Sequence, residues 1–464
     1  MLQSLFLFLT IAGVPIAIAM SGAAIIYIAV SGNLPSFVVI HRMISGIDSF
    51  PLLAVPFFIL AGNLMNNAGI TNRIFEIAMA LVGWLKGGLG HVNVMASIIF
   101  SGMSGTAIAD AAGLGTVEIK AMKDAGYSTE FSVGVTAASA TLGPIIPPSL
   151  PIVIYAMLAN VSVGAMFLGG ILPGLMIAAL IMLTVSYFAW KNGWGGDEPF
   201  KLSRFGKGLL EVGIVIGWPA MLWVLITQLD FPPRTTVFAG LILLFVADWK
   251  FRFVAVLPMM TPVLLIGGMT VGLFTPTEGA IAACIWALVL GLFWYKTLSF
   301  KRTIKVLLDT VETTSVVMFI VAASSIFSWM LTAEGITADI ASWILGVTNE
   351  PWIFLLLANA LMLFIGLFLE PVAAITILVP ILLPVVTQLG IDPIHFGLVM
   401  VLNLMIGLIT PPVGLVLFIM ARIAEISIER TMVALLPWFI PLLGSLVVIT
   451  YVPQIVLWLP SQFY

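Results

Sequence analysis

Charged residues and cysteine are scarce in this sequence. Asp, Glu, Lys and Arg make up only 8% of its 464 residues, against roughly 25% in an ordinary soluble domain. The single cysteine, Cys284, excludes a disulfide framework or a cysteine metal cluster. His41, His91 and His395 form no metal-ligand spacing. The net charge of -3 is too small to indicate nucleic acid or another strongly charged partner.

Other absences exclude whole classes of function. The sequence has no Gly-rich motif with a lysine for nucleotide phosphates, so an ATP-driven pump is not expected. It has no nucleophile with a base, and no set of metal ligands, at workable spacing. We therefore expect neither an enzyme nor an organic cofactor.

Hydrophobic sequence is nearly continuous instead. Hydrophobic residues account for 61% of the chain. The run from Met432 to Leu459 has no charged residue and exceeds the roughly 20 residues that span a bilayer. We expect a multi-pass protein of the lipid bilayer with about eleven crossings. The first crossing, over residues 5–30, follows no basic n-region and suits a retained helix better than a cleaved signal.

A segment with a proline pair occurs twice, at matching places in the two halves. The sequence LGPIIPPS at 142–149 returns as IGLITPPV at 406–413. Because proline removes a backbone donor and clashes with the preceding turn, we expect broken helices over about 131–160 and 395–421. Two interrupted helices in corresponding halves point to the binding site of a secondary transporter. The matching residues are Gly143, Pro147 and Pro148 in the first copy and Gly407, Pro411 and Pro412 in the second.

Each broken helix is preceded by a candidate hairpin, over about 90–124 and 351–389. The sequence NAGIT at 67–71 also recurs as AEGIT at 333–337. Basic residues flank the first hairpin, whereas no Lys or Arg occurs between Lys305 and Arg422. By the positive-inside rule the first hairpin enters from the cytoplasm and the second from the opposite side. The basic residues around the first hairpin are Arg73, Lys86, Lys120 and Lys123.

The sequence therefore predicts an all-α polytopic membrane protein, built as an inverted-topology repeat with two re-entrant hairpins and two broken helices. Residues 1–190 form the first repeat and residues 275–464 the second. Residues 191–274 form a cytoplasmic linker with extra scaffold helices. With the N-terminus inside, all but two of the 18 Lys and Arg fall on the cytoplasmic side. The exceptions are Arg42 and Arg234.

The tip of the first hairpin is rich in small and hydroxyl residues, namely Ser101, Gly102, Ser104, Gly105 and Thr106. Glycine lets the backbone approach a ligand and hydroxyls supply neutral ligands, which suits sodium together with an anion. The same residues would also allow tight helix packing without any ligand. Asp110 is costly at membrane depth and is a functional candidate, or else it caps the second arm of the hairpin.

The second hairpin carries an acid at its tip. Glu370 precedes Pro371, follows an apolar run and has no basic residue nearby in sequence. Its charge needs a cation, either sodium or a proton, unless the residue is a helix-capping acid at a wet surface. Asn403 and Ser139 lie one turn before the matched glycines and either point to the breaks or join helices. Since no Lys or Arg lies near the tips or proline pairs in sequence, helix dipoles and bound cations would have to balance an anionic substrate.

Several motifs together resemble the large membrane subunit, of the DctM type, of tripartite ATP-independent periplasmic (TRAP) transporters. The resemblance covers nearly the whole chain. The motifs are FPLLAVPFF at 50–58, AGNLM at 61–65, GGL at 87–89, the hairpin tip at 101–110, the break at 142–149 and TPTE at 275–278. The stretch 208–275 departs from it, because it holds three hydrophobic segments where many relatives have one.

The resemblance implies an elevator-type ion transporter fold, in which a domain containing both hairpins and both broken helices slides against a scaffold. It implies sodium as coupling ion, a small membrane subunit of about four helices and a periplasmic solute-binding protein. Substrates of the family are organic anions, usually carboxylates such as dicarboxylates, keto acids or sialic acids. The expected location is the cytoplasmic (inner) membrane of a bacterium or archaeon.

The resemblance also assigns site residues. Ser101, Ser104 and Thr106 would line one half-site, and Glu370 falls where the family carries an acid, often the shorter Asp. Unwound helices would contribute further residues, which are Gly143, Pro147, Thr410 and Pro411. Sodium is expected at Ser104, Gly143, Glu370 and Gly407.

Two other functions stay open at this stage. A stand-alone carrier, coupled to sodium or protons, would share the broad fold and would transport without a binding protein. A channel would need a continuous polar or carbonyl-lined pore, whereas the polar residues here cluster at two hairpin tips.

Overall fold

The structure is a computed structural model that describes residues 2–31, 35, 37–48, 50–227, 233–251, 253–270, 274–411 and 414–464. Over these residues the regular elements are all helices, which confirms the predicted all-α class. Five of the described helices are long and apolar enough to cross a membrane. They begin at Val163, Pro276, Phe300, Pro371 and Ile428.

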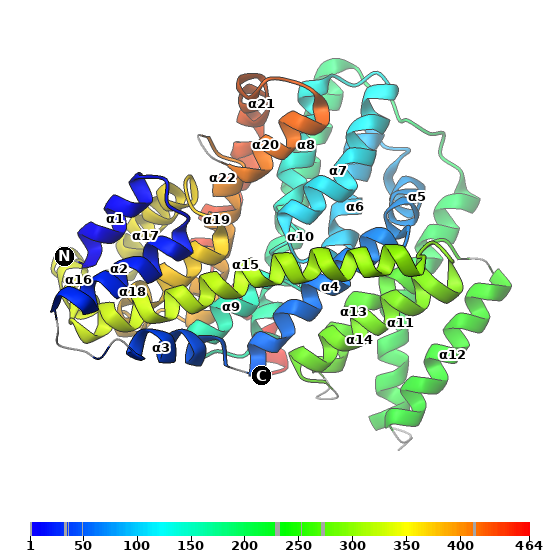
Figure 1. Ribbon diagram of the computed structural model, residues 1–464. Coiled ribbons are helices and arrows are strands. Elements are labelled where there is room, and N and C mark those ends of the chain that lie inside the picture. Colours follow the sequence, from blue (N-terminus) through cyan, green and yellow to red (C-terminus); the bar gives the residue numbers. More distant parts are fainter. Residues whose placement is uncertain are drawn as a thin grey trace.

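The first predicted crossing is wrong as a single helix. The segment 5–30 is divided between α1 (Leu2–Ile11) and α2 (Ile16–Ser31). Gly13 between them has a φ of 83°, a left-handed conformation that glycine adopts without strain and that stops the helix. Together with α3 (Phe37–Ile47), these helices pack against the long helix α15 (Phe300–Ala333) at one end of the molecule (Figure 1).

The first half of the chain continues with α4 (Ala54–Asn67) and α5 (Ile70–Val82) and then forms a helix pair. α6 (Gly88–Ser104) and α7 (Ala107–Asp124) meet at a tight turn where Gly105 has a φ of 65°. The Thr106 hydroxyl begins α7 by accepting a hydrogen bond from Ala109 N. α8 (Thr129–Ala140) then stops, and α9 (Leu150–Leu158) begins only after Ser149. The long α10 (Val163–Asn192) completes this half.

The second half repeats this order of elements. α16 (Ile336–Val347) begins after Gly335 with a φ of 73°, as α5 begins after Gly69 with a φ of 70°. α17 (Pro351–Gly366) and α18 (Pro371–Gln388) form a second helix pair. α19 (Pro393–Leu408) and α20 (Leu415–Ala424) are two parts of an interrupted segment. The chain ends in α21 (Ile428–Leu435), α22 (Phe439–Tyr451) and the short α23 (Gln454–Leu457).

The described residues between the halves form three helices, α11 (Leu202–Thr227), α12 (Pro233–Phe251) and α13 (Val256–Thr270). The predicted second half begins with α14 (Pro276–Leu288), which continues as a π-helix to Trp294. α11 to α13 correspond to the three hydrophobic segments that the sequence shows between 209 and 274. The linker before α11 is held at the base of α6, because the Asp197 carboxylate accepts hydrogen bonds from Leu89 N at 2.7 Å and from the Tyr127 hydroxyl at 2.6 Å.

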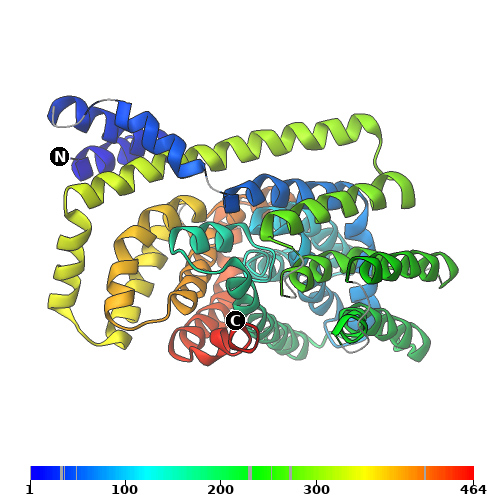
Figure 2. The same cartoon turned by 90° about the horizontal axis from the view of Figure 1, so that it is seen from below.

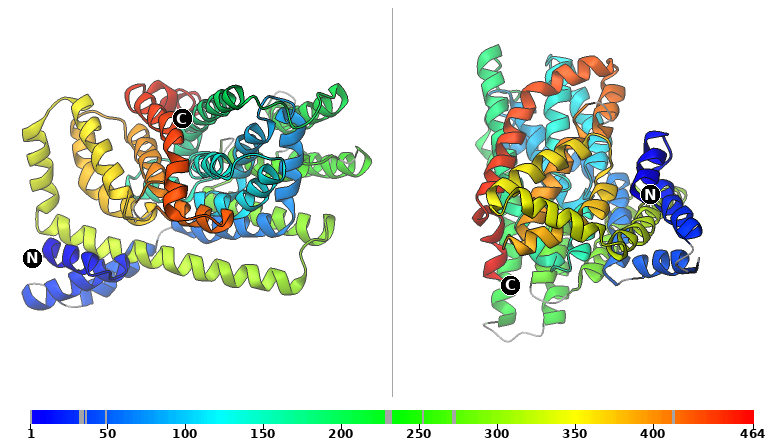
Figure 3. Two further views of the ribbon diagram at one scale, coloured as in Figure 1. Left: turned by 90° about the horizontal axis from the view of Figure 1, so that it is seen from above. Right: turned by 90° about the vertical axis from the view of Figure 1, so that its left-hand side faces the viewer.

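α15 joins the two ends of the molecule. It packs on α4 near its start and on α2, α3, α16 and α18 further along. In Figure 2 it runs along one side of the whole assembly, and its direction differs strongly from that of α6, α7 and α8 in Figure 1. Viewed along its length, α15 and the N-terminal helices project from the remaining helices (Figure 3, right). The space between this helix and the ends of the helix pairs is the setting of the candidate site.

Candidate functional site

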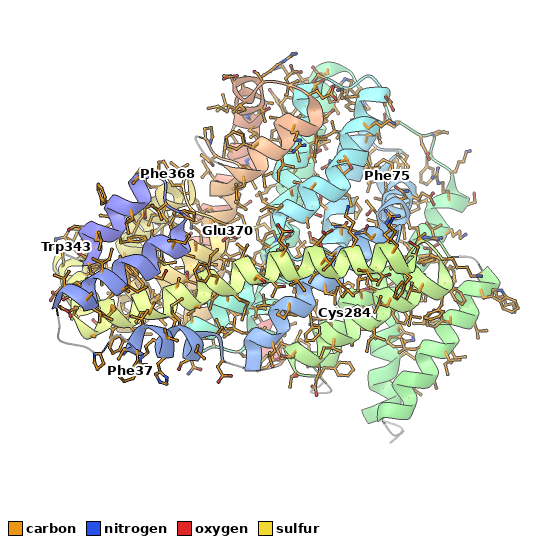
Figure 4. All side chains as sticks on the ribbon, viewed as in Figure 1. Phe37, Phe75, Cys284, Trp343, Phe368 and Glu370 are labelled. Carbon is orange, nitrogen blue, oxygen red and sulfur yellow. The ribbon has the colours of Figure 1, made fainter. Side chains whose placement is uncertain are left out.

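A cavity of about 1070 Å³ lies where the turns of both helix pairs meet α4 and α15. Ser104 and Thr106 reach it from the turn between α6 and α7, and Glu370 from the turn between α17 and α18. Glu370 lies near the centre of the molecule, next to α15 in the view of Figure 4. The other lining residues include Pro144 and Leu150 from the first helix break, Leu408 at the end of α19, and Asn63 and Val317 from the opposite wall. The fold thus brings both halves of the repeat to one cavity.

The first turn is seated in the first helix break. A methyl group added to Gly143 would lie 3.1 Å from the Thr106 carbonyl oxygen, and one added to Gly105 would lie 2.9 Å from the Pro148 carbonyl oxygen. Leu150 N also donates a hydrogen bond to the Gly105 carbonyl at 3.3 Å. These glycines are therefore required for backbone-to-backbone contact.

The second turn packs in a similar way on the second interrupted segment. A methyl group on Gly407 would lie 2.6 Å from the carbonyl group of Gly366. The Glu370 carboxylate accepts hydrogen bonds from Val372 N at 2.9 Å and Ala373 N at 3.2 Å, so this acid caps α18. It is a partly buried cap that also lines the cavity. Thr106 has the corresponding position at the start of α7.

The serines of the first turn divide into two kinds. The Ser101 hydroxyl is fully buried and donates to the Ser97 carbonyl at 2.5 Å, so it does not reach the cavity. The Ser104 hydroxyl lines the cavity and has no hydrogen-bond partner in the part of the chain that the structure describes, although the residue is only 6% exposed. A buried hydroxyl without a partner is available to a ligand.

The remaining predicted site residues that the structure describes do not line the cavity. Gly102 approaches Pro262 of α13, since a methyl group there would lie 2.9 Å from the proline ring. Pro147 and Pro148 are buried within the first break. The Thr410 hydroxyl donates to the Ile406 carbonyl at 2.6 Å, and Pro411 follows it. Pro412 lies outside the described residues. Of the four residues expected to hold sodium, Ser104 and Gly143 lie at the first turn, and Glu370 and Gly407 at the second.

Asn403 forms a hydrogen bond between helices, which is the second of the two roles that the sequence left open for it. Its amide donates to Asn359 Oδ1 at 2.6 Å and to the Val399 carbonyl at 2.8 Å. Its counterpart Ser139 likewise donates to Asn93 Oδ1 at 2.7 Å. Buried hydrogen bonds thus tie the helix pair of each half to its interrupted segment.

Asp110 lies in the first turn of α7 but does not cap it, because Thr106 does. The residue is 2% exposed, and neither carboxylate oxygen has a hydrogen-bond partner among the described residues. It does not line the cavity.

The opposite wall of the cavity holds polar residues that sequence reasoning missed. Arg302 of α15 lines it and donates to Asn67 Oδ1 at 3.2 Å. Asn63 and Asn66 of α4 lie beside this pair, and Glu312 of α15 lies further along. No basic residue is near the tips in sequence, yet the packing of α15 on α4 brings an arginine into the same cavity. The motif AGNLM at 61–65 includes Asn63, but nothing in the motif predicts its contact with α15.

The sequence was compared with protein families and with known proteins. Residues 3–455 match the profile of a family described as "Tripartite ATP-independent periplasmic transporter, DctM component". The sialic acid TRAP transporter large permease protein SiaM of Vibrio cholerae is 40% identical over 98% of this chain and 96% of its own length. The C4-dicarboxylate TRAP transporter large permease protein DctM of Pseudomonas aeruginosa is 35% identical over 96% of this chain and 94% of its own length.

Two solved transporters share the fold. The Alcanivorax borkumensis YdaH transporter superposes with a TM-score of 0.58 over 88% of this chain and 86% of its own, at 16% identity. Neisseria gonorrhoeae MtrF superposes with a TM-score of 0.57 over 89% of this chain and 83% of its own, at 15% identity. At these identities the likeness concerns the fold alone.

Proposed function

This chain belongs to the DctM family of tripartite ATP-independent periplasmic transporters, and we propose that it carries an organic carboxylate inward, coupled to sodium, by an elevator mechanism. It is a large permease component, a transport protein and not an enzyme. We further propose that it works in the cytoplasmic membrane of a bacterium or archaeon. Its partners there would be a small membrane subunit and a periplasmic solute-binding protein that delivers the substrate.

The observation that carries the proposal is the meeting of two helix N-termini at one cavity, those of α7 at Thr106 and α18 at Glu370. A helix N-terminus carries a partial positive charge that favours an anion. Glu370 would repel a carboxylate in the same cavity unless a cation neutralises it. Cation binding and carboxylate binding would therefore depend on each other, which is the requirement for coupled transport.

The cavity favours a carboxylate that has further hydrogen-bonding groups. Arg302 can pair with a carboxylate, and its contact Asn67 and neighbours Asn63 and Asn66 offer amide groups to hydroxyls. A volume of about 1070 Å³ reaches the upper end of the roughly 300–1,000 Å³ that small-molecule sites have. This room suits a sugar acid as well as a short dicarboxylate. The relatives compared above are named for both kinds of substrate.

The packing also supports an elevator motion. The helix pairs contact the interrupted segments of their own halves through glycines, which makes each a compact unit. The first turn also meets α4 through a glycine, because a methyl group added to Gly62 would lie 3.2 Å from the Ser104 carbonyl oxygen. Movement of the helix pairs past α4 and α15 would open the cavity to either side in turn.

The test is uptake into proteoliposomes that contain this chain with its small subunit. Radiolabelled sialic acid and succinate serve as probes, with and without the binding protein and an inward sodium gradient. We expect uptake of one probe class only when both are present. Sodium-driven uptake without the binding protein would instead establish a stand-alone carrier, and sodium-independent uptake would contradict the coupling.

A further inference from the structure

Two acidic residues on α7 are buried where no described residue neutralises them. Asp110 is 2% and Glu118 is 1% exposed. Both lie on the buried face of α7. The buried residues of this face recur every three or four positions from Ala107 to Met122. Alanines and glycines on the opposite face line the cavity, together with Thr116 and Val117. Helix α7 thus separates this acidic pair from the substrate cavity.

A chain of hydrogen bonds links Glu118 to two neighbouring helices through Asn93. Glu118 Oε2 accepts from the Asn93 amide at 2.6 Å, and the same amide donates to Thr136 Oγ1 at 2.7 Å. Asn93 Oδ1 in turn accepts from the Ser139 hydroxyl at 2.7 Å. Glu118 Oε1 and both Asp110 oxygens accept no hydrogen bond from any residue that the structure describes. The network connects α7 through α6 to the last turn of α8, directly before the helix break.

The fold itself does not need acids at these positions. The corresponding helix of the second half, α18, has Ala374 where α7 has Asp110, when Glu370 is matched with Thr106. In the same register Leu382 matches Glu118. Both residues are as deeply buried as their acidic counterparts. Because an apolar pair fills the equivalent site, packing alone does not explain Asp110 and Glu118.

A buried carboxylate with no neutralising charge and with unpaired oxygens is costly in its charged form, so each of the two acids must bind a cation or a proton. The described residues contain no group of three or more His, Cys, Asp or Glu, so a metal ion held by several such side chains is not expected at these acids. A proton needs only one carboxylate oxygen, and an unpaired hydroxyl costs less than an unpaired charge. Oε1 of Glu118 and either oxygen of Asp110 are free to take it.

We propose that Asp110 and Glu118 bind protons from the aqueous phase in the conformation shown and release them when α6, α7 and α8 change their surroundings during transport. This inference rests on the proposed function. Transport would then move protons as well as sodium and substrate. Protonation at Oε1 leaves Oε2 to accept from Asn93, whereas the charged form attracts Asn93 more strongly and shifts the start of the helix break.

No other charged or titratable group on the neighbouring described helices could take up the proton in place of these two acids. The elements packed against α7 are α5, α6, α8 and α20. Their remaining charged or titratable groups are exposed at helix ends or engaged elsewhere, as His91 is with Ser186 of α10 at 3.3 Å and Glu130 is with Arg430 at 2.6 Å. These groups, with those of α7 itself, are Arg73, Glu76, His91, Lys120, Lys123, Asp124, Glu130 and Arg422.

The test uses the complete complex in proteoliposomes with a pH-sensitive dye inside, sialic acid or succinate outside and an inward sodium gradient. We expect substrate-dependent acidification of the interior, a reduction to about half in Glu118→Gln, which keeps Asp110, and its loss when Asp110→Asn is added. The amide introduced by Glu118→Gln mimics the protonated acid, so substrate should still exchange. Glu76→Gln, an exposed acid on α5, is the matched control and should acidify like the wild type.

The outcomes separate this inference from the proposed function. Sodium-driven uptake by the wild type without any acidification, at every pH tried, would overturn the proton site and leave the proposed function intact. Acidification unchanged in Glu118→Gln and Asp110→Asn would place the proton elsewhere. Absence of sodium-driven uptake altogether would contradict the proposed function instead. The wild-type measurement decides the question even if a variant fails to fold.

Discussion

Glycine residues at the turns and helix breaks hold the candidate site together, and Gly407 is the most tightly confined of Gly105, Gly143, Gly366 and Gly407. Replacing it by alanine would place a methyl group 2.6 Å from the Gly366 carbonyl group, which is backbone and cannot turn away. We expect Gly407→Ala to lower the stability of the complex by about 1–3 kcal/mol. The measurement is thermal unfolding in detergent, followed by tryptophan fluorescence.

Gly444→Ala provides the matched control, because Gly444 also lies inside a helix and has no atom within 4 Å of an added methyl group. That change should be neutral or slightly stabilising, by up to about 1 kcal/mol. Equal melting temperatures for the two variants would show that the contact between α17 and α19 is loose in solution.

At the residue scale, a residue of the cavity could be predicted only where its neighbours in sequence make it unusual. Glu370 stood out because it is a lone acid before a proline in apolar sequence, and the structure puts it at a helix start in the cavity. Glu118 and Arg302 did not stand out. Their surroundings are made by Asn93 and Asn67, which come from other helices, and such contacts leave no local pattern.

At the scale of elements, the linker before α11 is tied to the first helix pair by one side chain. Asp197 accepts from Leu89 N at the start of α6 and from the Tyr127 hydroxyl. Burial, and then the bond to Asp197, raise the pKa of Tyr127, so the phenol keeps its proton and remains a donor. We expect Asp197→Asn to weaken this start of α6 by about 0.5–1 kcal/mol.

Hydrogen exchange of residues 83–91 measures that effect, with faster exchange expected in Asp197→Asn. Asp124→Asn, at the exposed end of α7, is the control and should leave exchange there unchanged. Identical exchange in both variants would mean that the backbone bonds from Gly87 N to Gly195 O and from Asp197 N to Gly83 O hold the linker alone.

The elements themselves were predictable where proline and glycine interrupt the hydrophobic sequence. The helix breaks at 141–149 and after Leu408 follow directly from residues that cannot continue a helix. The split between α1 and α2 was missed, although Gly13 and Pro15 stand there, because unbroken hydrophobicity was read as one crossing. Hydropathy indicates that a segment lies in an apolar environment, but it does not indicate where a helix stops and the chain turns.

At the scale of the whole molecule, the elevator mechanism requires the first turn to move past α13. Gly102 and Pro262 are adjacent across this contact, with an added methyl group on Gly102 lying 2.9 Å from the proline Cβ. In a Cys284→Ser background, a disulfide between Gly102→Cys and Pro262→Cys should arrest transport, and a reducing agent should restore it.

The control disulfide joins Ala68→Cys and Gly291→Cys, because a methyl group added to Gly291 would lie 3.2 Å from Ala68 Cβ. This disulfide connects the end of α4 to the π-helix that continues α14. It should leave transport unchanged because both ends belong to the scaffold. Full transport with the first disulfide closed would contradict movement of α6 along α13.

The arrangement of the halves shows what sequence can and cannot supply at this scale. The repeat was visible in the two proline-paired segments, and charge bias supplied an orientation for each half. The path of α15 was not predictable, since a helix of 34 residues with apolar composition reads as another crossing. Its contacts with α4 and α18, beside the cavity, and with α2 arise only from packing over long sequence separations.

The most direct test of the central claim is the flux of radioactive sodium that accompanies uptake of sialic acid or succinate by the complete complex. We expect the wild type to import sodium in a fixed ratio to substrate. In Glu370→Gln, which keeps the size of the side chain but removes its charge, we expect the ratio to fall while the purified complex stays folded. An unchanged ratio in this variant, or substrate uptake by the wild type without sodium influx, would contradict the account.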